Sequence, residues 1–131
     1  ALADARKGVA MFMQEAINVP VLGVVENMAY FTPEELPENK YYIFGKEGAQ
    51  NLASDLKIPF LGEVPLVQSI REAGDVGRPA ALQEEGPLKE AFEEITRNVV
   101  RELVVRHTDL PPTEAIKITT MAGCSAVKPK K

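Results

Sequence analysis

The sequence is poor in the residues that build disulfides, metal centres and membrane spans: it has one cysteine, one histidine and no tryptophan. A single thiol, Cys124, cannot form a disulfide within the chain, which suits a reducing compartment, so we expect a cytoplasmic protein. No apolar run approaches the roughly 20 residues of a membrane span. The net charge of −4 indicates no positively charged surface of the kind that binds nucleic acid. We therefore expect neither a membrane nor a nucleic-acid partner.

The sequence also lacks the short motifs that mark common catalytic sites. It contains no phosphate-binding loop, no HExxH, no CxxC and no GxSxG pattern. His107 falls at a predicted helix end, where a surface position favoured by the helix dipole is expected. Cys124 lies in a Gly-Cys-Ser turn near the C-terminus, and two interpretations stay open. It is an incidental exposed thiol, or it is a metal or cluster ligand whose site also needs ligands from another chain. We predict no catalytic residue and no other metal ligand.

No initiator methionine opens the sequence, and helix-forming residues begin at Ala1 without a capping side chain before them. We therefore expect the chain to be the C-terminal portion of a longer protein. Its apolar fraction of 45% is ordinary for a globular domain.

The most informative stretch is residues 19–25, an apolar run rich in β-branched residues and too short for a useful helix. Such a run predicts a strand buried on both faces, as in parallel sheets. Glu26 and Asn27 interrupt it with polar groups. Ligands of open α/β sheets bind beyond the carboxyl ends of the strands, so these two residues are placed where a binding crevice would open. The alternative is a strand that simply ends in a polar turn.

Periodicity and turn residues predict the other elements. We expect a helix over residues 1–16 with Val9, Phe12, Met13 and Ala16 buried, a loop over 29–40, and bulky residues 41–44 returning to the core. Further along, we expect a helix over 47–56, a second strand over 58–65, a short helix over 67–73 ended by Gly74, a long helix over 87–106, and a short strand over 115–120. The buried stripe predicted for the long helix comprises Leu88, Ala91, Phe92, Ile95, Val99 and Leu103.

Strand, helix and strand in this order predict an α/β fold with a parallel sheet and a crossover helix. Two parallel strands do not make a stable sheet by themselves. We therefore expect upstream sequence to supply the other strands of a doubly wound, mainly parallel sheet.

The residues resemble the Mrp-type P-loop ATPases of the MinD/ParA-like group, which act as iron–sulfur cluster carriers. The resemblance covers about residues 1–105 and is carried by four segments: Asp4-Ala5-Arg6-Lys7-Gly8, Glu26-Asn27-Met28-Ala29-Tyr30-Phe31, Ile43-Phe44-Gly45 with Gly48-Ala49, and Phe60-Leu61-Gly62-Glu63-Val64-Pro65-Leu66. It implies that residues 1–108 are the C-terminal portion of an ATPase domain of P-loop NTPase type, whose phosphate-binding half is missing, and that residues 109–131 are a tail.

The resemblance also implies roles for individual residues. Asn27 matches the asparagine that reads the adenine edge, and an amide suits this because it both donates and accepts. Val64, Pro65 and Leu66 match the segment that lines the adenine pocket with backbone groups. Asp4 matches a switch-associated position. The family's cluster-binding CxxC falls just after Phe31, where this sequence has Thr-Pro-Glu-Glu and no cysteine.

The function implied is that of an ATP-binding, ATP-hydrolysing iron–sulfur cluster carrier, to which this portion contributes the adenine side of the site and a dimer surface. The full-length protein would use ATP with Mg²⁺, act as a homodimer and meet iron–sulfur client or scaffold proteins, whereas this portion alone would be inactive. The absent CxxC leaves cluster binding itself open. Two alternatives remain: a partitioning or septum-site type of ATPase, and a non-enzymatic binding module that keeps only the fold.

Overall fold

The computed structural model describes residues 1–33, 35–36, 38–82 and 86–112, with the side chain of residue 80 excepted. The predicted strand over 115–120 and Cys124 lie outside these residues. Along the chain, the elements are α1 (Leu2–Phe12), β1 (Val24–Phe31), α2 (Gly48–Leu56), β2 (Phe60–Leu66), α3 (Gln68–Asp75), a short 3-10 helix (Ala80–Leu82) and α4 (Pro87–Asp109).

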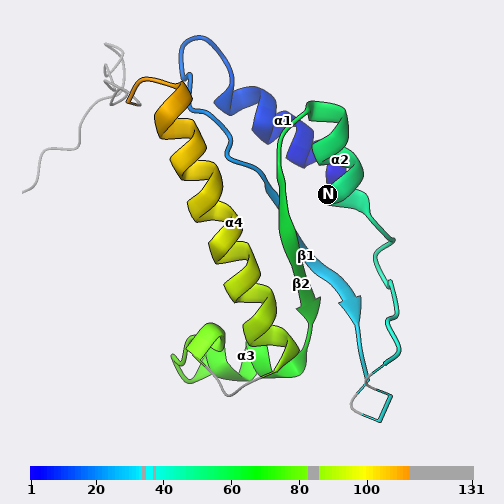
Figure 1. The fold of residues 1–131 in the computed structure, drawn as a ribbon. Coiled ribbons are helices and arrows are strands. Elements are labelled where there is room, and N and C mark those ends of the chain that lie inside the picture. The colour runs from blue at the N-terminus through cyan, green and yellow to red at the C-terminus, as the bar shows by residue number, and fades with distance from the viewer. Residues whose placement is uncertain (34, 37, 83–85, 113–131) are drawn as a thin grey trace, which may run out of the picture.

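Strands β1 and β2 pair in parallel, and α2 forms the connection between them. Helix α4 runs along β2 on one side of the strands, while α1 and α2 lie on the other (Figure 1). The predicted α/β class with a parallel sheet is confirmed. Within the described residues the sheet has only these two strands, so each has an outer edge that no regular strand pairs.

Strand β1 differs from the prediction at both ends. Pairing begins where the Val24 N–H donates to the Pro59 carbonyl at 3.0 Å, because β2 starts only at Phe60 and offers residues 19–23 no partner. The strand does not stop at Glu26 and Asn27 but continues to Phe31. Residues 29–31, predicted as loop, therefore belong to the strand. Nor is β1 buried on both faces, since a two-stranded sheet cannot cover it.

Helix α1 is shorter than predicted, and most of its expected buried stripe is exposed. Val9 alone in α1 is buried, whereas Phe12 and Met13 lie open, the latter with 59% of its surface accessible. The helix packs chiefly on α2, where Arg6 forms an ion pair with Asp55. Because α2 covers only part of α1, the remaining apolar residues of the predicted stripe find no partner among the described elements.

Helices α2 and α4 follow their predicted patterns more closely. Leu52 and Ala53 of α2 are buried, and Ala49 and Leu56 on the same face are half-buried. Helix α4 begins with Pro87 at its first position, as predicted. Its stripe is half-buried as far as Val99, but Leu103 is exposed because β2, the strand that α4 covers, does not extend that far along the helix. Helix α3 continues through Gly74 to Asp75 instead of ending before it.

Two contacts fix α4 against β2. The Asn98 side-chain amide donates to the Leu61 carbonyl at 2.9 Å. Ile95 lies so close to Gly62 that a Cβ added there would be 2.8 Å from the Ile95 Cγ1. These contacts hold the helix along the centre of β2.

The residues expected to return to the core, Tyr41 to Phe44, are instead on the surface, and Phe44 is 70% exposed. Among the described residues the buried apolar side chains are few and mostly small: Val9, Ala29, Leu52, Ala53, Leu61, Val64 and Ala73. The described elements supply only one helix layer on each side of two strands, so they leave residues 41–44 nothing to pack against.

Candidate functional site

Asn27 on β1 lies directly across from Val64 on β2 in the parallel register. Pro65 and Leu66 follow Val64 and complete β2. The predicted juxtaposition of Asn27 with the Val64–Leu66 segment on neighbouring parallel strands is therefore present. Val64 and Pro65 are buried and Leu66 is half-buried, whereas the Asn27 side chain is exposed. We refer to these four residues as the strand-end edge.

Strand β1 is irregular immediately after Asn27. Asn27 and Phe31 are four positions apart, while their partners Val64 and Leu66 are only two apart, so β1 bulges at this point. Met28 has a φ of 56°, which is uncommon for a residue with a side chain. Bulges re-aim side chains and end regular pairing, often next to binding sites. The bulge leaves both Asn27 and Met28 exposed, while Ala29 beyond it is buried.

Glu26 does not open onto a crevice as the sequence suggested. Its Oε1 accepts a hydrogen bond from the Gly48 N–H at 3.0 Å, so its carboxylate caps the N-terminus of α2. A carboxylate at this end of a helix is favoured by the helix dipole. Its Oε2 is buried and has no hydrogen-bond partner among the described residues. Glu26 therefore has a place in the packing of α2 on β1 that its position in the sequence did not reveal.

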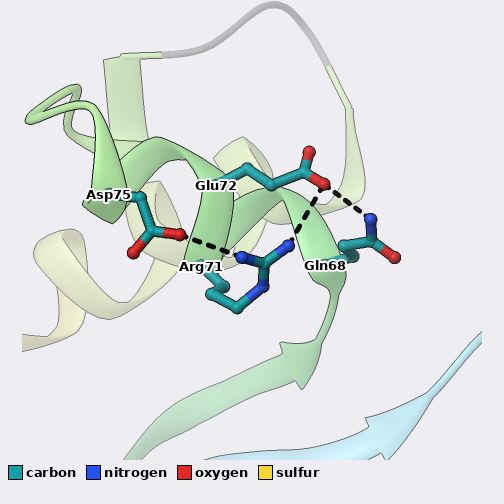
Figure 2. Close-up of polar contacts among 4 residues, drawn as sticks. All are labelled: Gln68, Arg71, Glu72 and Asp75. Carbon is teal, nitrogen blue, oxygen red and sulfur yellow. Dashed lines mark hydrogen bonds and ion pairs between the residues drawn. The ribbon is translucent and has the colours of Figure 1, made fainter.

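Beyond the strand-end edge, β2 leads directly into α3, whose exposed face carries a chain of polar contacts (Figure 2). Arg71 donates to Asp75 at 2.9 Å and to Glu72 at 3.4 Å, and the Gln68 amide donates to the same Glu72 oxygen at 2.6 Å. All four side chains are exposed, so each contact stabilises the helix by about 0.2–1 kcal/mol. Together they favour a short helix that starts two residues after Leu66.

An open cavity of about 770 Å³ adjoins the strand-end edge and shares Pro65 with it. It lies between β2, the N-terminal half of α4 and the chain that follows β1; its wall includes Tyr30, Thr32, Lys40, Phe60, Gly62, Glu63, Pro65, Val67, Leu88, Glu90 and Glu94. The Asn27 side chain is not part of this wall. The cavity is large enough for a nucleoside-sized group.

The charges on the cavity wall are mostly negative. Glu63, Glu90 and Glu94 contribute carboxylates, and Lys40 contributes an ammonium group. The Lys40 Nζ lies 4.0 Å from the centre of the Tyr30 ring, a cation–π contact that holds it at the wall. Such a surface disfavours a polyphosphate, because three carboxylates repel it and one cation attracts it. It suits a neutral group better.

Aromatic contacts continue outward from Tyr30. Its ring meets Tyr42 edge to face, with centroids 6.2 Å apart, and Lys46 lies 5.5 Å over the Tyr42 ring. The Lys46 ammonium also pairs with Glu47 at 3.2 Å. This hydrogen bond, and then the charge of Glu47, raise the pKa of Lys46. Together with the backbone bonds between Phe31 and Tyr41, these contacts hold the chain between β1 and α2.

The other residues singled out in the sequence lie away from this edge. Asp4 is exposed in the first turn of α1. His107 is exposed near the end of α4, with its Nδ1 2.9 Å from the Leu103 carbonyl, in agreement with the predicted surface position. Cys124 lies outside the described residues. No three histidine, cysteine or carboxylate side chains in the described ranges are grouped to hold a metal ion.

A parallel strand pair with helices on both faces defines the class of α/β proteins, in which ligands bind beyond the carboxyl ends of the strands. The chain belongs to the ParA family of P-loop NTPases, because the family's profile, described as NUBPL iron-transfer P-loop NTPase, matches residues 1–100.

Several curated proteins are similar to the chain. The iron-sulfur cluster transfer protein NUBPL of Dictyostelium discoideum is 40% identical over 110 residues, which cover 83% of this chain and 33% of the relative. An iron-sulfur cluster carrier protein of Synechocystis is 46% identical over 83 residues, covering 63% and 23%. The Arabidopsis thaliana "iron-sulfur protein required for NADH dehydrogenase, mitochondrial" is 41% identical over 104 residues, covering 79% and 32%. The chain thus spans a third or less of the length of these relatives.

Sequence reasoning missed three features of the site. The bulge after Asn27 carries no glycine or proline that would have marked it. The cap from Glu26 to Gly48 joins residues 22 positions apart, and no local pattern encodes such a contact. The cation–π contact of Lys40 with Tyr30 depends on how the chain returns after β1. The pair Tyr41-Tyr42 is plain in the sequence, but its packing against Tyr30 is not.

Proposed function

We propose that the chain is the C-terminal portion of an ATP-binding and ATP-hydrolysing iron–sulfur cluster carrier, in which residues 1–108 complete the ATPase domain and residues 109–131 form a tail. Membership of a P-loop NTPase family described by iron transfer supports the general class. The names of the three relatives all concern iron–sulfur proteins, which favours cluster transfer over a partitioning or septum-site role.

The observation that carries the nucleotide part of the proposal is the pairing of Asn27 with Val64 at the strand-end edge. An exposed amide can accept from the adenine N6 amino group and donate to a neighbouring ring nitrogen. The backbone of Val64, Pro65 and Leu66 would line the pocket beside it. Pro65 offers only a carbonyl, so it can accept from a base amino group but cannot donate.

The residues present suit the base and not the phosphates. The cavity that shares Pro65 with the edge has more carboxylates than cations, which disfavours a triphosphate there. The 131 residues also contain no phosphate-binding loop. We therefore assign the phosphate groups and Mg²⁺ to the part of the family's length that this chain does not span. ATP would supply the phosphoryl group whose hydrolysis drives the cycle, and this portion would hold and select the base.

The homodimer and the cluster belong to the same proposal. The exposed apolar run Tyr41 to Phe44 follows the place where relatives of the Mrp type carry their CxxC, and it supports a protein contact surface in this region. Asp4 on α1 is proposed as the switch-associated residue. The iron–sulfur cluster is the cargo, to be passed to client or scaffold proteins, and Cys124 is a candidate ligand because it is the only thiol in the chain.

The compartment is also a proposal. Low cysteine content favours a reducing compartment, which we take to be the cytoplasm, although the name of the Arabidopsis relative includes the word mitochondrial. None of the helices in the described part of the chain combines the length and apolar character that crossing a membrane requires. Fractionation of cells that express the tagged full-length protein would decide between the two locations.

The test of the proposed function is base selection by the full-length protein. Calorimetric titrations with non-hydrolysable ATP and GTP analogues should show a preference for ATP. Replacing Asn27 with alanine should reduce that preference roughly tenfold, because a bidentate amide–base contact contributes about 1–3 kcal/mol of discrimination. Asn27→Asp should shift preference toward GTP, since a carboxylate only accepts and guanine offers two adjacent donors.

The exposed Asn51 on α2 gives a matched control. Asn51→Ala and Asn51→Asp remove the same groups on another element and should leave both affinities unchanged. If the full-length protein bound the two analogues equally, and Asn27→Asp changed nothing, the assignment of a base-reading role to Asn27 would be wrong.

A further inference from the structure

We infer that Glu26 is a positioning residue for base selection: its carboxylate anchors the N-terminus of α2 to β1 and thereby fixes the place of the neighbouring Asn27. The inference rests on the proposed function, because the placement of Asn27 affects binding only if Asn27 contacts a base. No motif of the sequence and no relative's name assigns this role.

The first step of the argument is the cap itself. The residue before α2, Glu47, is in the left-handed conformation with a φ of 60° and makes no side-chain cap to its own helix. Its carboxylate pairs instead with Lys46. The Gly48 N–H donates a hydrogen bond to the Glu26 Oε1 at 3.0 Å. Glu26 thus supplies from β1 the acceptor that α2 lacks locally, and this ties the helix to the strand.

The second step concerns the strand around Asn27. Regular pairing with β2 ends at Asn27 and resumes at Phe31, so the bulge leaves the C-terminal side of Asn27 without a ladder partner. On its N-terminal side the adjacent residue is Glu26, whose side chain is half-buried and bonded to α2. The ladder pairs Glu26 with Glu63 of β2, and the carboxylate adds a tie to α2 on the other side. Loss of that tie should let the strand shift at the residue that reads the base.

The third step is the closeness of the packing at this point. A Cβ built on Gly48 would lie 3.4 Å from the Glu26 Oε1 and 3.5 Å from the side chain of Leu2 on α1. The Glu26 Oε2 is fully shielded from solvent and has no partner among the described residues. A shielded carboxylate oxygen without a hydrogen bond costs free energy, so its presence calls for an explanation, and the anchoring role supplies one. Three elements, α1, α2 and β1, therefore meet around Gly48, the residue that the Glu26 carboxylate holds.

The experiment compares Glu26→Ala and Glu26→Gln with wild type and Asn27→Ala in the full-length protein. The readout is the ratio of dissociation constants for non-hydrolysable ATP and GTP analogues. Glu26→Ala should lose most of the preference for ATP, about tenfold. Glu26→Gln keeps an acceptor for the Gly48 N–H and should stay within about threefold of wild type. A purely structural residue would change both affinities together and leave their ratio unchanged.

A second variant separates anchoring at Glu26 from general loosening of α2. Asp55→Ala removes the ion pair between α2 and Arg6 of α1 without touching β1. It should leave the ATP-to-GTP ratio unchanged. Hydrogen exchange gives an independent readout, because the amides of the first turn of α2 should exchange faster in Glu26→Ala than in Asp55→Ala.

The outcomes are distinct. If Asn27→Ala abolishes the preference for ATP while Glu26→Ala retains it, the positioning role is wrong and the proposed function stands. If wild type has no preference and Asn27→Ala changes nothing, both fail. If Glu26→Ala does not fold, the ratio in Glu26→Gln decides, together with exchange at the Gly48 amide. If the ATP-to-GTP ratio of Glu26→Gln stays within threefold of wild type and the Gly48 amide is protected, the role is supported. If Glu26→Gln loses the preference for ATP while that amide is still protected, the role is wrong.

Discussion

Gly62 on β2 and Ile95 on α4 are packed so closely that a single added carbon at Gly62 would lie 2.8 Å from the Ile95 Cγ1. The φ of Gly62, 143°, is also one that residues with side chains rarely adopt. The glycine therefore sets how near α4 can approach the strand that leads to Val64.

The first prediction follows from this contact. Gly62→Ala should lower the free energy of unfolding of the full-length protein by about 1–3 kcal/mol, because it overpacks the helix–strand contact and strains the backbone. Gly8→Ala is a matched control: Gly8 is inside α1 with nothing within 4 Å of its missing Cβ, so alanine there should stabilise by about 0.5–1 kcal/mol. Urea unfolding of both variants measures the two opposite shifts. Equal shifts would contradict the packing argument.

The second prediction concerns the hydrogen bond from Asn98 to the Leu61 carbonyl. Asn98→Ala should destabilise the protein by about 1–2 kcal/mol, since it leaves a part-buried carbonyl without its donor. Asn98→Asp should be at least as unfavourable, because a carboxylate cannot donate and would face the carbonyl oxygen. Thr96→Ala, on the exposed side of the same helix, should have a much smaller effect on the unfolding midpoint.

The third prediction concerns the 131-residue chain produced alone. It should not hydrolyse ATP and should bind ATP only feebly, because it has no phosphate-binding loop and phosphate contacts dominate affinity in such sites. Calorimetry on the chain and on the full-length protein, under the same conditions, makes the comparison. Micromolar ATP binding by the chain alone would show that the base and not the phosphates governs affinity.

The fourth prediction concerns the cargo. If Cys124 donates a cluster ligand, full-length protein with Cys124→Ser should load less iron than wild type after anaerobic reconstitution, because clusters usually need four ligands. Iron content and visible absorbance measure the loading. Equal loading in both proteins would remove Cys124 from the mechanism, and no loading in either would remove cluster transfer from the proposed function.

The sequence predicted the parts of the fold that short-range patterns encode. The helix over α2, the start of α4 at Pro87 and the parallel strand pair followed from periodicity and from turn residues. The class of the protein followed from the segment around Asn27 and from the Val64–Leu66 segment. These signals are local, so they can be read in a chain that spans a third or less of its relatives' length.

The predictions that failed concern residues whose packing or hydrogen-bond partners are distant in the sequence. Phe12, Met13 and Phe44 have the character of core residues, but the described elements cover none of them. The start of β1 at Val24 was set by where β2 begins, a fact that the apolar run from Val19 does not contain. The Glu26 cap required the position of Gly48, which only the folded chain brings near. Burial and capping across elements are properties of the assembled layers.

The antiparallel bridge between Phe31 and Tyr41 has a consequence for how this family can change over time. Reciprocal hydrogen bonds of 2.9 and 2.8 Å close the base of the segment between these residues, and Lys40 adds its contact with Tyr30 of β1. Substitutions, insertions and deletions between the bridge and Lys40 are thereby less constrained by the strand that carries Asn27. A lineage could gain or lose a pair of metal-binding thiols there in few mutational steps, while the pairing of β1 with β2 stayed under its own selection.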